Sequence, residues 1–268
     1  NQNGQLNRLS GVSALTLGFL TLTIQILLIR EVLQIFLGNE LTIGLSLAIW
    51  LFGTSVGSLI LPGIIRSETG WHRLIILLLP VTIITFFLIQ LSPKVFGFLP
   101  GIPRDIGSTV GVILLTVFPV ATLCGFLFPY LVKTVFHSEN NSLIPGIRRV
   151  YILESLGAML AAVVLNLLLF NLLTNFQLML ISLSLFYLVL LLDKIRGNSQ
   201  RLFRMALLVC LLFLLLMLGF SKPLMNGLNR LTFSPYQVVM EQETPYGNHK
   251  VLELEGQRVV LTQGVIEY

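Results

Sequence analysis

Residues 155–192 read SLGAMLAAVVLNLLLFNLLTNFQLMLISLSLFYLVLLL and contain no Asp, Glu, Lys or Arg. One membrane-spanning helix needs about 20 apolar residues, because every backbone N–H and C=O must be paired inside the segment. This stretch is therefore long enough for two spans. A polar group at its centre predicts a tight turn between two antiparallel helices, and its members are Asn171, Thr174, Asn175 and Gln177.

Five further apolar runs flank this stretch. They cover residues 9–29, 41–65, 74–93, 106–132 and 205–221. The whole chain is 55% hydrophobic and only 11% charged, with a mean hydropathy of +0.89, which excludes a soluble globular domain. We expect an all-α integral membrane bundle of about seven transmembrane helices over residues 1–228, followed by a β-rich tail over residues 229–268.

The basic residues give the predicted orientation in the membrane. Short loops on the cytoplasmic side of a membrane are enriched in Lys and Arg. On the side of the N-terminus lie Arg8, Arg66, Arg73, Lys133, Arg148, Arg149, Lys194, Arg196, Arg201 and Arg204, whereas the other side has Arg30, Lys94 and Arg104. We therefore predict a cytoplasmic N-terminus and, after seven crossings, an extracytoplasmic tail. The same distribution favours a lipid bilayer over nucleic acid as the partner of this basic chain.

The tail differs in character from the rest of the chain. Polar and apolar residues alternate in 236–241, 250–255 and 258–262, and turn residues separate these segments. This pattern predicts two or three short strands of an antiparallel meander. About forty such residues bury too little surface to fold alone, so we expect the sheet to need a partner or a continuation of the chain.

The sequence offers no complete catalytic site, metal site or cofactor site. It has no Gly-rich phosphate loop and no Ser/His/Asp arrangement, and its three histidines show no metal-ligand spacing. The two cysteines, Cys124 and Cys210, lie inside apolar runs and are interpreted as small hydrophobic residues. We therefore assign no catalytic residue, metal ligand or bound cofactor within this chain.

Ionisable residues at membrane depth are the candidates for a functional role, because an unpaired charge in lipid costs several kcal/mol. Arg30 and Glu31 follow the first apolar run, where an interfacial pair at a helix end is the favoured interpretation and a buried site the alternative. Glu154 lies in the first turns of the fifth helix, within reach of Arg149. These four residues are the intramembrane polar candidates.

Small residues predict where helices approach closely. Gly53 and Gly57, and likewise Gly107 and Gly111, have the spacing that lets two helices pack backbone to backbone in a bilayer. For the first pair, packing within the chain is favoured over dimerisation. Pro119 and Pro129 predict kinks in the fourth helix.

Several segments together resemble one family, the membrane-embedded spermidine synthase-like proteins. In the bundle they are Ser10-Gly11, residues 53–58 (GTSVGS), Pro119 with Gly125 and Pro129, and residues 151–158 (YILESLGA); in the tail they are residues 234–237 (SPYQ), Gly247, residues 252–256 (LELEG) and Thr262. In this family a helical bundle precedes an aminopropyltransferase domain, whose small N-terminal β-domain the tail resembles.

The resemblance implies that the chain anchors a polyamine aminopropyltransferase-type domain, which lies outside this sequence and uses decarboxylated S-adenosylmethionine as co-substrate. It also implies a bacterial inner membrane. Of the substrate-binding residues of the family, only Tyr268 is carried over. One alternative is a structural subunit of a larger membrane complex, in which residues 229–268 contact other subunits or a separate catalytic domain. A small-molecule transporter is the second alternative and draws on Pro119, Gly125, Pro129 and Glu154.

Overall fold

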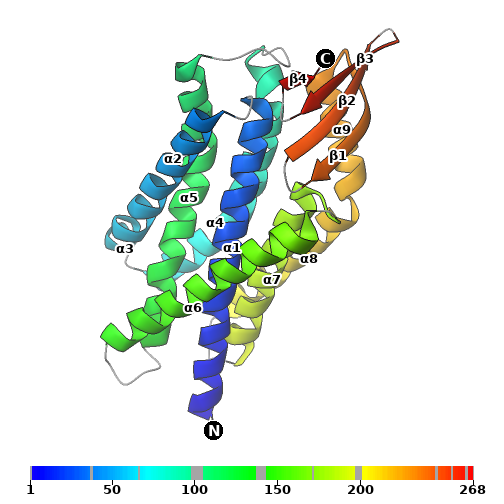
Figure 1. The fold of residues 1–268 in the computed structure, drawn as a ribbon. Coiled ribbons are helices and arrows are strands. Elements are labelled where there is room, and N and C mark those ends of the chain that lie inside the picture. Colours follow the sequence, from blue (N-terminus) through cyan, green and yellow to red (C-terminus); the bar gives the residue numbers. More distant parts are fainter. Residues whose placement is uncertain are drawn as a thin grey trace.

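The computed structural model describes residues 2–36, 39–65, 67–97, 105–136, 143–170, 172–196, 201–244, 247–254, 256–262 and 265–267. Seven helices among these residues are long and apolar enough to cross a membrane. They form a bundle, and a small antiparallel sheet lies at the C-terminal end of the chain (Figure 1). The predicted fold class is therefore confirmed.

The spans correspond to the apolar runs of the sequence. The helices are α1 (Gln2–Ile35), α2 (Glu40–Leu59), the short α3 (Leu61–Ile64), α4 (Glu68–Val95), α5 (Ile106–Phe136), α6 (Leu143–Val164) with the π-helical turn η1 (Leu165–Leu169), α7 (Asn175–Arg196), α8 (Arg201–Gly219) and α9 (Ser221–Phe233). Helix α3 begins at Leu61, directly after α2, and has Pro62 in its first turn; α2 and α3 together form one candidate span over residues 40–64. Pro119 and Pro129 both lie inside the continuous helix α5.

The long uncharged stretch divides where its polar residues predict a turn. Helix α7 begins at Asn175, and the side chains of Thr174 and Gln177 cap each other's backbone N–H groups at 3.3 and 3.2 Å. This reciprocal arrangement is a capping box, which satisfies backbone donors at the start of a helix. Asn171 lies outside the described residues.

Two pairs of helices approach closely at glycines. A Cβ on Gly57 of α2 would lie 1.9 Å from the Thr122 oxygen of α5, and a Cβ on Gly125 of α5 would lie 2.2 Å from the Thr54 oxygen of α2. Helices α1 and α6 meet in the same way through Gly18 and Gly157, where the corresponding distances are 1.8 and 1.9 Å. Packing of the Gly53 and Gly57 pair within the chain is therefore confirmed.

The second glycine pair behaves differently. A Cβ on Gly111 would meet no atom within 4 Å, and the nearest atom to one on Gly107 belongs to Asp105 of the preceding loop. The prediction of a close helix contact there is wrong for the described chain, because this side of the first turns of α5 has no neighbouring helix.

The boundary between bundle and tail also differs from the sequence prediction. Residues 229–233 are not the start of a strand but the last turn of α9. The tail has four strands instead of two or three, namely β1 (Gln237–Thr244), β2 (Gly247–Leu254), β3 (Gln257–Thr262) and β4 (Val265–Glu267). They form an antiparallel meander in the order β1-β2-β3-β4. The sequence does not predict α9, because the segment is too polar for a membrane span and contains Pro223, Asn226, Gly227 and Asn229, which disfavour a helix.

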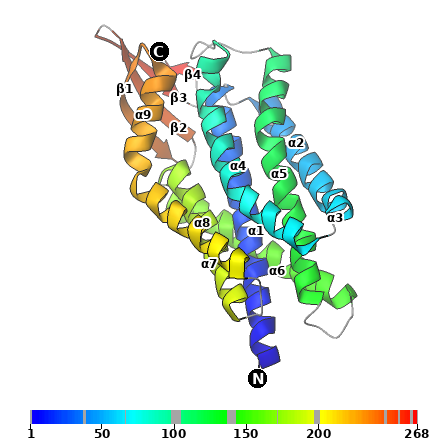
Figure 2. The same ribbon diagram turned by 180° about the vertical axis from the view of Figure 1, so that it is seen from behind.

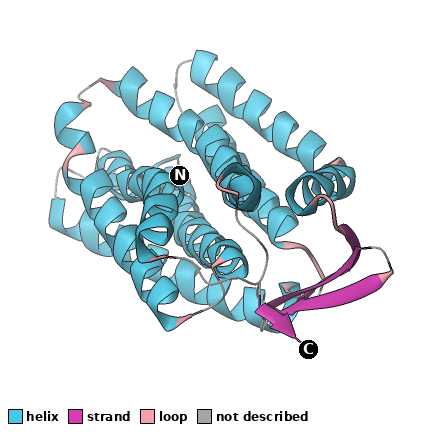
Figure 3. Ribbon diagram, turned by 90° about the horizontal axis from the view of Figure 1, so that it is seen from above, coloured by secondary structure: helices cyan, strands magenta, loops and turns pink. Residues whose placement is uncertain are grey.

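The sheet lies beside the bundle and not over its centre (Figures 1 and 3). The N-terminus and the sheet are at opposite ends of the bundle, as an odd number of crossings requires. The view from behind shows α9 in front of the sheet, above α8 (Figure 2). Along β2 the side chains of Asn248, Lys250 and Leu252 alternate with more exposed ones and are buried. These three side chains form the buried face of β2, and Leu261 of β3, which pairs with Lys250, is buried as well.

The first prediction concerns the close approach of α2 and α5 at Gly57. Replacing Gly57 by Ala places a methyl group against the Thr122 carbonyl, and we expect it to destabilise the protein by about 1–3 kcal/mol. Gly44→Ala in the same helix has open space around the new methyl group, so we expect it to be neutral or stabilising. Thermal unfolding in detergent measures both, and equal stability of the two variants would contradict close packing at Gly57.

Candidate functional site

Glu31 is buried at the end of the bundle that faces the sheet. It lies in α1, four residues before the helix ends, and its side chain is 1% exposed. The carboxylate accepts a hydrogen bond from Gln90 Nε2 of α4 and another, at 2.8 Å, from Asn175 Nδ2 of α7. Three helices that are far apart in sequence therefore meet on one carboxylate.

This geometry corrects the favoured interpretation of Glu31 as half of an interfacial pair. The carboxylate is enclosed because α4 and α7 pack against this part of α1 and place Gln90 and Asn175 on it. A buried carboxylate costs several kcal/mol unless hydrogen bonds or opposite charges compensate for the lost solvation. The two amide donors supply part of this compensation.

Arg30 connects the same helix end to the sheet. Its Nη2 donates a hydrogen bond of 2.6 Å to the backbone oxygen of Thr244, the last residue of β1. Its guanidinium also lies 4.1 Å from the centre of the Phe170 ring, in a cation–π contact. Neighbouring residues of α1 therefore bind different elements, since Arg30 reaches the sheet and Glu31 the helices.

A second carboxylate lies on the sheet side. Glu241 of β1 pairs with Lys250 of β2 at 3.0 Å and accepts hydrogen bonds from Asn248 at 3.1 Å and from Asn229 of α9 at 2.7 Å. The Lys250 side chain is 7% exposed, and its ammonium lies 4.9 Å from the ring centre of Phe233. Glu241 thus joins α9 to two strands.

The two carboxylates belong to one polar network. Lys250, Glu241 and Arg30 all lie close enough to Glu31 to interact with it electrostatically. We call this network the docking cluster; it consists of Arg30, Glu31, Gln90, Asn175, Asn229, Glu241, Asn248 and Lys250. Next to the docking cluster, Thr232 Oγ1 of α9 donates a hydrogen bond of 3.2 Å to the backbone oxygen of Gln90, which holds α9 against α4.

The other predicted residues lie elsewhere. Glu154 and Arg149 lie on α6 where it crosses the N-terminal half of α1, since the Glu154 backbone packs on Gly18 and the Arg149 side chain lies near Gly11. Gly18 precedes Glu31 by 13 residues of α1, which is about 20 Å of helix. The structure therefore does not bring Glu154 and Arg149 together with Arg30 and Glu31. Tyr268 lies outside the described residues.

Sequence reasoning missed most of the docking cluster. Gln90 interrupts an apolar run, and the pattern around Asn175 predicts only a turn. Isolated polar residues at membrane depth are nevertheless expected to have partners. Lys250 shares the buried face of β2 with Leu252, whereas a lysine in an alternating strand normally faces water. The packing of α1, α4 and α7 buries Gln90 and Asn175, whereas Lys250 is buried because the sheet packs against α9, where its ammonium lies over Phe233.

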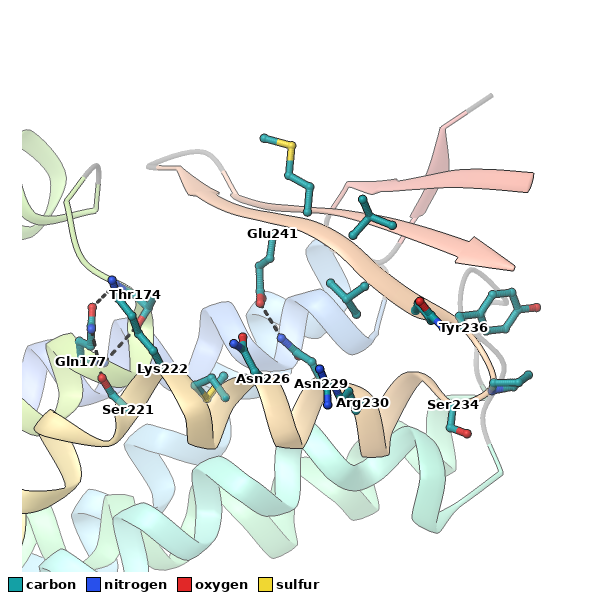
Figure 4. Close-up of a pocket in the computed structure, with 16 residues that line it drawn as sticks. Thr174, Gln177, Ser221, Lys222, Asn226, Asn229, Arg230, Ser234, Tyr236 and Glu241 are labelled. Atoms are coloured by element: carbon teal, nitrogen blue, oxygen red, sulfur yellow. Dashed lines mark hydrogen bonds between the residues drawn. The ribbon is translucent and has the colours of Figure 1, made fainter. Parts of the chain in front are cut away.

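A groove adjoins the docking cluster on the side of α9. It has a volume of about 860 Å³ and lies between α9 and β1, and both Asn229 and Glu241 line it (Figure 4). Among the described residues, no group of three or more His, Cys, Asp or Glu side chains is placed to hold a metal ion. The arrangement can hold two structural units together and can offer charged and polar groups to a ligand in the groove.

The fold and its apolar surface define the chain as a polytopic helical membrane protein. Large apolar side chains are exposed along α2, α6 and α8, where a lipid bilayer would cover them. Comparison with family models, with curated proteins and with solved structures found no match to this chain.

The burial of Glu31 makes a second prediction. Glu31→Ala leaves the amides of Gln90 and Asn175 without their acceptor, and we expect a loss of about 2–4 kcal/mol of stability. The matched control is Glu40→Ala, which removes an exposed carboxylate at the same end of the bundle and is expected to change stability by less than about 1 kcal/mol. Unfolding of both variants in detergent tests this difference. Similar stabilities would show that the buried carboxylate contributes nothing.

The third prediction concerns Glu241 and the pH dependence of the stability of the fold. Burial raises the pKa of this carboxyl, but the Lys250 ammonium and the donated hydrogen bonds outweigh burial, so that its pKa lies below the ordinary 4.5. A lowered pKa means that the carboxylate stabilises the fold above about pH 4.5, and that this contribution is lost as the pH falls through the folded-state pKa.

We therefore expect the unfolding temperature to fall as the pH is lowered from 5 to 3, and this fall to be smaller in Glu241→Gln. The control is Glu253→Gln, whose carboxylate pairs with Arg258 on the exposed face of the sheet. It should retain the pH dependence of the native chain. An identical pH profile for the native chain and Glu241→Gln would contradict the prediction.

Proposed function

We propose that this chain is the membrane module of a spermidine synthase-like protein, and that it holds an aminopropyltransferase-type domain in a fixed position at the membrane surface. The bundle supplies the attachment to the bilayer, and the four-stranded sheet supplies the start of the water-exposed domain. The catalytic residues and decarboxylated S-adenosylmethionine then belong to that further domain. In this proposal the bundle has a positioning role.

The docking cluster is the observation that carries the proposal. A domain that is merely tethered needs only a flexible linker, but here the sheet contacts the bundle through buried charges. Arg30 binds the backbone oxygen of Thr244, and Lys250 and Glu241 interact electrostatically with Glu31. Buried polar groups of this kind are costly unless every partner is in place, so they favour a single relative orientation.

The topology of the sheet supports the same proposal. Strand β1 lies against α9, whereas β4 is at the opposite edge of the sheet and pairs with β3 over three residues only. An edge strand presents unpaired N–H and C=O groups that another strand can continue. A further domain therefore has an available edge on the side of the sheet away from α9.

The same edge would serve the alternative function, a structural subunit whose sheet is extended by a strand of a partner protein. The two differ in chemistry, because only the first predicts aminopropyl transfer. They also differ in sidedness: transfer from decarboxylated S-adenosylmethionine fits a cytoplasmic sheet, whereas the distribution of Lys and Arg predicts an extracytoplasmic one. Labelling of a cysteine introduced at the exposed Arg258 in intact cells distinguishes the two sides.

The fourth prediction tests the proposed function directly. The native protein, purified from its membrane, should have an intact mass well above the 29.9 kDa of this chain. It should also convert putrescine and decarboxylated S-adenosylmethionine into spermidine and methylthioadenosine. Lys250→Gln should lower this activity more than Arg258→Gln, because only Lys250 belongs to the docking cluster. A mass near 29.9 kDa without transfer activity would contradict the proposal.

A further inference from the structure

Helix α6 turns one face outward along most of its length. Exposed residues recur on this face at helical spacing, and its large apolar side chains include Ile152, Leu156, Met159, Leu160, Val163 and Leu167. The opposite side of the helix packs on α1 through Gly157. Figure 1 shows α6 crossing in front of α1, at the outside of the bundle. Lipid therefore covers the exposed face of α6.

Asn166 interrupts this apolar face near the end of the helix that is closer to the sheet. It belongs to the π-helical turn η1, and it is exposed. Its Nδ2 donates a hydrogen bond of 2.9 Å to the backbone oxygen of Ala162, one turn earlier in the same helix. The described residues provide no other partner for this side chain. One N–H and the Oδ1 acceptor of the amide therefore remain unpaired.

The depth of Asn166 in the membrane follows from its apolar neighbours. Leu167 and Leu172 come after it on the way to the turn before Asn175, and their side chains are 70% and 75% exposed. Side chains of this size and exposure indicate that the hydrocarbon layer extends past Asn166 toward this turn. An unpaired N–H or C=O in this layer has no water to bind and is costly, so the amide requires a further partner.

The chemistry of the amide selects the partner. Copies of one chain insert into the membrane in the same orientation, so that a two-fold axis between two copies is perpendicular to the membrane. Residues beside such an axis meet their own counterparts. A carboxamide is complementary to itself, because the N–H of each Asn166 can donate to the Oδ1 of the other. The other strongly exposed helices, α2 and α8, contain no Asn or Gln.

We propose that α6 forms the contact between two copies of this chain within the bilayer, and that the two Asn166 side chains hydrogen-bond to each other where the helices cross. Val163 and Leu167 lie on the same face and pack around the amide pair. Hydrogen bonds between Asn side chains stabilise helix contacts in lipid, where apolar side chains alone supply little driving force. The proposal does not depend on the proposed enzymatic function.

The test uses the full chain in lipid vesicles at a series of protein-to-lipid ratios, and single-molecule photobleaching measures the fraction of paired copies. We expect Asn166→Leu to weaken association at least about fivefold, because both hydrogen bonds of the amide pair are lost. Asn166→Gln keeps a self-complementary amide and should retain most of the association. The matched control is Ser55→Leu, which places a leucine on the exposed face of α2 and should associate as the native chain does.

A second measurement locates the contact while Asn166 stays in place. Val163→Cys should form a disulfide between two copies when membranes that contain the protein are treated with an oxidant. Leu212→Cys, on the exposed face of α8, should not. The native Cys124 and Cys210 are buried, so the native chain should give no cross-link.

Cooperative unfolding of each variant in detergent establishes that it is folded. The proposal fails if the native chain stays monomeric at every ratio, or if Asn166→Leu associates as strongly as the native chain. It also fails if Leu212→Cys cross-links as efficiently as Val163→Cys. Cross-linking of Val163→Cys only to a different protein would overturn it as well, and would assign the face of α6 to that protein.

Discussion

The buried carboxylate of Glu31 is the constraint on which the contact between bundle and sheet depends. A carboxylate at this depth must find donors or positive charges within the protein. Gln90 and Asn175 provide the donors, and Arg30 and Lys250 provide positive charge nearby. Because these groups come from α1, α4, α7 and β2, satisfying one side chain fixes the positions of three helices and a strand.

Inside the bilayer the bundle is held by a different kind of contact. Lipid tails are as apolar as the protein interior, so an apolar side chain gains little when it moves from lipid into the bundle. Close van der Waals packing between helices matters more, and small residues permit it. Gly57 and Gly125 bring α2 against α5, and Gly18 and Gly157 bring α1 against α6. These contacts determine the centre of the bundle, whereas the docking cluster determines its end. The protein therefore combines dry backbone packing at membrane depth with polar contacts at the surface.

Helix α9 links the docking cluster to the groove beside it. This helix donates from Asn229 to Glu241 and from Thr232 to Gln90, while its other residues line the groove. Helix α9 therefore contacts both the first strand of the sheet and the last turns of α4.

The sequence by itself determined the number of spans, the division at Asn175 and the antiparallel meander, because these follow from local patterns of apolar length, turn residues and alternation. It also identified Arg30 and Glu31 as candidates, since charges near membrane depth are visible in one dimension. Only the tertiary structure decided that Glu31 and Lys250 are buried and that residues 221–233 form a helix. It also decided that no helix within the described residues packs closely on Gly107 and Gly111. The physical reason is that burial of a polar group depends on neighbours distant in sequence, and no local pattern specifies those neighbours.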